Sequence, residues 1–129
     1  VRANIFELLY DTITATLSSG NVTAAFIGNQ PSYPQVVINP SRVIQTRLSL
    51  DRATSEYTGE VEIDLYTLKA KDIDQVSDEI CEDLISSEAD LESNGLYIDD
   101  IEDSNEDTFF WNDQKIHTKT LLLSYRLNI

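Results

Sequence analysis

The sequence predicts an α+β fold, a largely antiparallel β-sheet with two amphipathic helices packed on one of its faces. Apolar residues recur every three or four positions near the N-terminus and around residues 72–85, as they do along one side of a helix. In several other segments they alternate with polar residues, as in strands with one buried face. Because the two periods occupy separate stretches and do not interleave as βαβ units, an antiparallel sheet is favoured.

Two helices are expected. The first spans residues 2–18 and stops at Ser18-Ser19-Gly20-Asn21. The second begins at Asp72, with Gln75 placed three residues later as in a capping box, and frays after Ile85. The apolar stripe of the first helix is Ile5, Leu8, Leu9, Ile13 and Leu17, and that of the second is Ile73, Val76, Ile80, Cys81 and Leu84.

Strands are expected at residues 22–27, 36–38, 42–50, 59–66, 96–101 and 115–127. Asn39-Pro40 is expected to end the second of them, and residues 51–58 and 102–107 are expected to be loops. The length of 129 residues suits one domain, residues 1–129, with a projecting loop or hairpin around residues 28–58 and an acidic loop around residues 99–107.

The net charge of −14 comes from 23 acidic and nine basic residues. So few Lys and Arg residues disfavour direct binding to nucleic acid or to anionic lipid, both of which require a basic face. Residues 72–107 hold 15 of the acids and no base. This block is interpreted as a solvated face, a contact for a basic partner, a surface that repels DNA, or an adaptation to high salt.

The longest apolar run, Leu121-Leu122-Leu123, is too short to cross a bilayer. No charged-then-apolar segment opens the chain, so no secretory signal is expected. The start at Val1 fits removal of an initiator methionine before a small residue.

Few side chains suit catalysis or metal binding. His117, the only imidazole, is expected to be exposed on a strand, and Cys81 to be a buried thiol whose pKa is raised by acidic neighbours. No phosphate-binding glycine motif is present. Residues 103–107 space their side-chain oxygens as a calcium loop does, but Thr108 and Gln114 stand where that loop requires Gly and Glu. We expect no enzyme, no metal and no cofactor.

Phe109-Phe110-Trp111 cannot all face one side of a strand. At least one of these aromatic side chains is therefore expected to point away from the core. Exposed aromatic side chains favour a surface that contacts a partner, so core and interface both remain open for this segment.

The layout of the chain resembles the tail terminator (tail completion, or head–tail joining) proteins of long-tailed bacteriophages. The resemblance is carried by Pro31-Ser32-Tyr33-Pro34 ahead of an apolar strand, by Asp64-Leu65-Tyr66 at the end of an alternating strand, and by Arg126 late in the closing strand. It extends over nearly the whole chain and is one of layout, without invariant catalytic residues.

The resemblance implies a non-enzymatic virion protein that caps the tail tube as a ring, usually a hexamer, ends tail polymerisation and joins the tail to the head. The partners it implies are further copies of the chain, the major tail tube protein and the head connector protein, with DNA passing through unbound and no membrane involved. The implied location is the tail–head junction of the virion, and the host cytoplasm during assembly.

Subunit or tail-tube contacts are expected at Gln30, Tyr33, Arg42, Arg47, Phe110 and Trp111. An acidic lumen or partner face is expected at Asp99, Asp100, Glu102, Asp103, Glu106 and Asp107. Arg42 and Arg47 are expected to pair with acids of residues 72–107 on a neighbouring subunit. Two other functions stay open: a small acidic adaptor or inhibitor that binds a basic partner, and an acidic enzyme or metal-binding module that uses residues 99–107.

Overall fold

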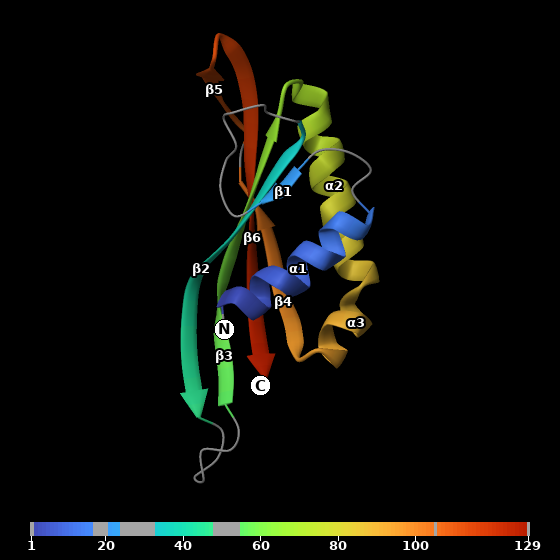
Figure 1. The fold of residues 1–129 in the computed structure, drawn as a ribbon, viewed down its shortest axis with the longest axis vertical. Helices are drawn as coiled ribbons and strands as arrows, with labels where there is room; N and C mark the ends of the chain where they lie inside the picture. Colours follow the sequence, from blue (N-terminus) through green and yellow to red (C-terminus); the bar gives the residue numbers. More distant parts are fainter. Residues whose placement is uncertain (1, 17–20, 24–32, 48–54, 105, 129) are drawn as a thin grey trace.

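The computed structural model describes residues 2–16, 21–23, 33–47, 55–104 and 106–128 (Figure 1). Within these ranges the chain forms three helices and six strands. In chain order they are α1 (Arg2–Thr16), β1 (Asn21–Thr23), β2 (Gln35–Arg47), β3 (Ser55–Thr67), α2 (Ala70–Ser86), α3 (Glu88–Ser93), β4 (Leu96–Asp103), β5 (Asp107–Trp111) and β6 (Gln114–Asn128). The expected helix stop at residues 18–20 and the strand residues 24–27 and 48–50 lie outside the described residues.

The strands form one sheet in the order β1-β2-β3-β6-β4. Every pairing is antiparallel except that of β1 with β2, which is parallel. β5 pairs with the first residues of β6, so β4 and β5 follow one another along the same side of β6. The predicted α+β fold with a largely antiparallel sheet is confirmed.

The helices α1 and α2 pack on the same face of the sheet, as predicted (Figure 1). Alternation in β3 directs Val61, Ile63 and Leu65 under the helices, and all three are fully buried. Both predicted helix stripes join the same core cluster, through Ile5, Leu9 and Ile13 of α1 and Ile73, Val76, Ile80 and Leu84 of α2. Full burial of each such side chain contributes roughly 1.5–3 kcal/mol, so this one interface supplies most of the hydrophobic stabilisation.

The start of α2 differs from the prediction. The helix begins at Ala70 after Lys69, which makes no side-chain cap. Asp72 therefore lies in the first turn, where its charge still favours the helix dipole, and Gln75 donates to Glu79 at 3.3 Å. The predicted capping box is wrong because β3 runs on to the buried Thr67 and only two residues link it to the helix.

The strand β2 is continuous through Asn39-Pro40, which was expected to end it. A bulge between Asn39 and Arg42 interrupts the ladder there, and proline is tolerated at bulges because it needs no ladder partner for an N–H. The loop predicted at residues 51–58 is also wrong for residues 55–58. These residues are strand because they pair with β2 on one side and β6 on the other.

The predicted acidic loop is largely strand. Residues 99–103 belong to β4 and Asp107 begins β5, which leaves only the segment around residues 104–106 between the strands. Pairing with the apolar strand β6 imposes the extended backbone, with Glu102 opposite Leu122. The turn at Glu92–Gly95, which leads into β4, holds Gly95 at a φ of 88°, a conformation that favours glycine.

Candidate interaction surfaces

The face of the sheet opposite the helices carries two rows of carboxylates. Glu60, Glu62 and Asp64 alternate with the buried residues of β3 and so point to this open face. Asp100 and Glu102 share the face because they pair with Ser124 and Leu122, which alternate with the buried residues of β6. Since β6 lies between β3 and β4, the two rows flank it. We call these five carboxylates the acidic sheet face.

The acidic residues predicted to form one surface are divided by the structure. Only Asp100 and Glu102 reach the acidic sheet face. Asp99 lies at a bulge of β4 and accepts hydrogen bonds from Arg126 Nε at 3.0 and 3.2 Å. The same guanidinium lies 5.4 Å from the ring centroid of Tyr97, which holds the pair in place.

The other members of the acidic sheet face, Glu60, Glu62 and Asp64, were missed as site residues in the sequence. The alternation of these acids with buried apolar residues of β3 indicated that they share one face of that strand. The sequence does not show that β3 lies beside β6, so it could not show that these acids lie near those of β4. Thr120 Oγ1 donates to Asp64 Oδ1 at 2.6 Å across these two strands.

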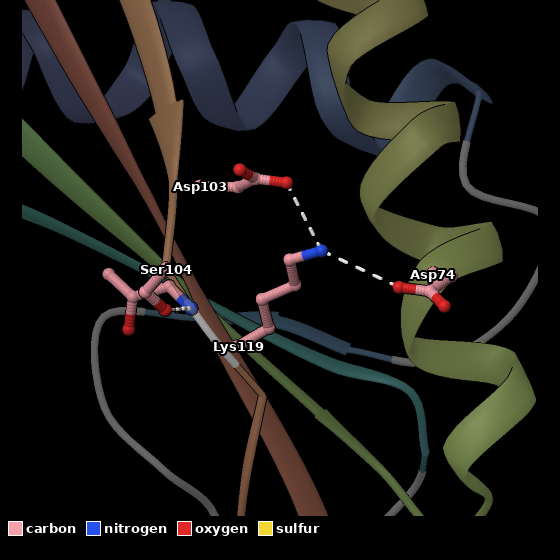
Figure 2. Close-up of polar contacts among 5 residues, drawn as sticks. Asp74, Asp103, Ser104 and Lys119 are labelled. Carbon is pink, nitrogen blue, oxygen red and sulfur yellow. Dashed lines mark hydrogen bonds and ion pairs between the residues drawn. The ribbon is translucent and has the colours of Figure 1, made fainter.

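Asp103 faces the helices and belongs to an ion-pair cluster (Figure 2). Lys119 Nζ lies 3.2 Å from Asp103 Oδ2 and 3.5 Å from Asp74 Oδ1, and the Lys119 side chain is only 12% exposed. Burial lowers the pKa of Lys119, but hydrogen bonds and charges from Asp103 and Asp74 outweigh it and raise the pKa overall. Ser104 and Thr120 exchange two hydrogen bonds beside it. The cluster ties α2, β4 and β6 together and so has a structural role.

Glu106 and Asp107 lie at the junction of β4 and β5. A side-chain hydrogen bond with Asp74 is the main cause that raises the pKa of Glu106. Among the described residues, no group of three His, Cys, Asp or Glu side chains is placed to hold a metal ion. His117 lies within β6 and is half-buried, less exposed than predicted, because β3 and β5 flank it.

Cys81 is half-buried, and so less buried than the sequence predicts, beside the acidic residues of α2 and β4. Burial, followed by the charges of Asp78 and Asp103, raises the pKa of its thiol, as the sequence predicts. At mildly alkaline pH we expect the folded protein to react with an alkylating reagent more slowly than the unfolded chain, since only the thiolate attacks and the raised pKa lowers its population. The measurement is thiol labelling with and without urea. Equal rates in the two states would contradict this placement of Cys81.

A groove runs between α2–α3 and β4, at the edge of the sheet. It consists of two adjoining pockets of about 280 and 300 Å³, which share Ile85 and Ile101. The first pocket is lined by the apolar residues Leu84, Ile85, Ile98 and Ile101 and by Glu88, Asp99 and Asp100. Because Asp99 is paired with Arg126 and Asp100 points to the open face, Glu88 supplies the acidic rim. We call this the edge groove. Ile85 is 65% exposed and Ile98 and Ile101 are half-buried, so part of the apolar lining is open to solvent in the isolated chain.

The β5–β6 hairpin carries the predicted aromatic segment. Asn112 and Asp113 both have positive φ, as in a two-residue type I′ turn. Phe109 packs edge-on against Tyr66, with ring centroids 5.9 Å apart. Phe110 points to the other side of the hairpin and is 72% exposed, which confirms that one of the three aromatics leaves the core.

The remaining predicted contact residues are dispersed. Gln30 lies outside the described residues, as does the side chain of Arg47. Arg42 is exposed and lies opposite Glu60 of its own sheet. Burial raises the pKa of Tyr33, whose hydroxyl is buried without a hydrogen-bond partner among the described residues. Trp111 is 42% exposed near the hairpin turn.

Exposed apolar and acidic surfaces thus lie on several sides of the described part of the molecule. No described helix is long and apolar enough to span a membrane. No family model matches the chain, and no curated protein matches it in sequence. Among solved structures, it is similar to a chain of the virion of a native gene transfer agent particle, with a TM-score of 0.51 and 10% identity over 94% of this chain and 92% of that chain. At this identity the likeness is one of fold.

Proposed function

We propose that the protein is a structural subunit of a phage-like virion. In particular, we propose that it forms a ring that caps the tail tube, ends tail polymerisation and joins the tail to the head connector. The observation that carries the proposal is the likeness to a virion chain, because it covers nearly all of both chains. The resemblance of the layout to tail terminators supports the finer assignment.

The acidic sheet face suits a surface past which DNA moves. Five carboxylates on an open face would repel phosphates that come within the screening length, which is about 8 Å at physiological ionic strength. The nearby cation Arg126 is held by Asp99, and Arg42 lies opposite Glu60 on the neighbouring strand. Placed along the lumen of a ring, this face would let DNA pass without binding it.

The proposed role is non-enzymatic and needs no cofactor. The proposed partners are further copies of the chain, the tail tube protein and the head connector protein, at the tail–head junction of the virion. An adaptor that offers the acidic sheet face to a basic partner is the second candidate, and the same five carboxylates favour it. The two functions differ in self-assembly, since an adaptor would be a monomer or dimer.

The test is an assembly reaction with the tail tube protein encoded by the same genome. We expect light scattering to give the mass of a ring, with a hexamer as the leading case, and electron microscopy to show the ring at tube ends whose growth has stopped. The paired variants Glu62→Gln, Asp100→Asn and Glu62→Lys, Asp100→Lys serve as controls. Both should cap tubes, and only the lysine variant should retain DNA. A chain that stays monomeric and does not bind to tube ends would contradict the proposal.

A further inference from the structure

We propose that the tip of the β5–β6 hairpin of one copy docks into the edge groove of the next copy. Phe110 would fill the apolar floor of the groove, and Lys115 would meet Glu88 on its rim. This inference rests on the proposed assembly of subunits and names the contact that would build it.

The hairpin tip presents an aromatic and a cationic side chain on one side. Phe110 and Lys115 are directly paired across the hairpin, and cross-strand partners share a face. Phe110 is 72% exposed and Lys115 is also exposed. The tight turn at Asn112-Asp113 fixes the hairpin, so little conformational entropy is lost when the tip binds.

The edge groove complements this tip in shape and in charge. An enclosed apolar cavity of roughly 150 Å³ is enough to hold a benzene ring, so a pocket of about 280 Å³ has room for a phenyl side chain. Ile85, Ile98 and Ile101, which are exposed or half-buried, supply apolar contacts for the ring. Glu88 on the rim is exposed, and its carboxylate is available to a lysine.

The occupant must come from another copy. The hairpin projects from one end of the molecule, while α3 and the start of β4 lie towards the opposite end (Figure 1). The tip cannot therefore reach the groove of its own chain. The charges are also segregated along the sequence, since residues 72–107 hold 15 acids and no base, whereas residues 108–129 hold one acid and three bases. Lys119 and Arg126 are held by Asp103 and Asp99 of their own chain, whereas Lys115 lies exposed on the hairpin, where it can meet a carboxylate of another copy.

A contact between two different surfaces is heterologous, so it continues from copy to copy and forms a ring when the rotation closes. Pairing of β4 edges between copies is disfavoured in comparison. β4 carries Asp99, Asp100, Glu102 and Asp103. Repulsion between these charges disfavours pairing of the β4 edge strand with β4 of another copy. The tip-to-groove contact is therefore the self-contact that the charges favour.

The contact can be mapped by photo-crosslinking. Phe110 is replaced by the photoreactive residue p-benzoylphenylalanine in a full-length chain, which is mixed with isotope-labelled chain and irradiated. We expect interchain crosslinks, identified by mass spectrometry, at residues 84–88 and 98–101. The same photoreactive residue at Tyr10, an exposed aromatic on α1, is the control and should not label the groove.

Substitutions provide an independent readout. Phe110→Ala should weaken self-association by about tenfold or more, as loss of a central aromatic anchor does, while Tyr10→Ala should leave it unchanged. Lys115→Glu and Glu88→Lys should each weaken association, and the double reversal should restore it. Glu92→Lys, an exposed acid outside the groove on the same short helix, controls for total charge.

The outcomes separate the contact from the proposed function. If rings form but the crosslinks map elsewhere and Phe110→Ala associates normally, the proposed contact is wrong while the proposed ring-forming function still stands. If the chain stays monomeric at every concentration tested, both are overturned. Interchain crosslinks in the groove together with rescue by the double reversal would establish the contact.

Discussion

Replacing Gly59 with alanine is expected to destabilise the protein by about 3 kcal/mol or more, because no space exists for a Cβ atom. A Cβ at this position would lie 1.8 Å from the carbonyl oxygen of Arg42 and 2.7 Å from its carbonyl carbon. Both are backbone atoms, so no rotation of a side chain can relieve the overlap. The same carbonyl accepts a hydrogen bond of 3.2 Å from the Tyr125 hydroxyl, which any displacement of β2 would break.

The measurement is urea unfolding followed by circular dichroism. Thr58→Ala is the matched control, since Thr58 is the preceding residue and points to the open face. Thr58→Ala should lower the free energy of unfolding by less than about 1 kcal/mol, the range that strand propensities span. If Gly59→Ala were as stable as Thr58→Ala, the close approach of β2 to β3 at the bulge would be wrong.

Replacing Ile80 with alanine is expected to cost about 2–5 kcal/mol, the range for removing a large aliphatic side chain from a core. Ile80 is fully buried on the side of α2 that packs against the sheet. Truncation would leave a cavity between the helix and the strands, where both sides are held by other contacts. The position therefore tests whether α2 covers the sheet through the face that the structure gives it.

Ile85 provides an unusually close control for Ile80, because it lies on the same helix and is the same residue type but is 65% exposed. Ile85→Ala should change the free energy of unfolding by no more than about 0.5 kcal/mol. The comparison is made at low protein concentration, so that self-association does not contribute. A loss below about 0.5 kcal/mol for Ile80→Ala would mean that the buried face of α2 is assigned wrongly.

Much of the fold could be predicted from local patterns. The stripe of Ile73, Val76, Ile80 and Leu84 and the alternation of β3 and β6 identified most of the core correctly. The wrong predictions of secondary structure arose where local sequence signals favoured a loop but pairing with neighbouring strands imposed an extended backbone. Asn39-Pro40 is a strand breaker by composition, yet β3 pairs on both sides of it and a bulge absorbs the proline. The acids of β4 suit a loop, yet pairing with β6 extends them.

The candidate surfaces were predicted less completely. Exposure of one aromatic near residue 110 followed from alternation alone, and that prediction is confirmed at Phe110. The acidic sheet face could not be assembled from sequence, because Glu62 and Asp100 are far apart in the chain and meet only through β6. The edge groove likewise depends on the short helix α3. This helix has six residues and one buried side chain, Leu91, which is too weak a pattern to predict it from sequence.

By itself the sequence determined most of the buried residues, how charge is divided along the chain and which class of fold results. These properties follow from hydrophobic periodicity and composition, which depend on near neighbours. Only the tertiary structure decided which strands lie side by side, where the bulges fall and which carboxylates share a face. Strand order is non-local: it is set by the total burial and hydrogen bonding of the whole sheet, and the alternation of one strand carries no information about its neighbour.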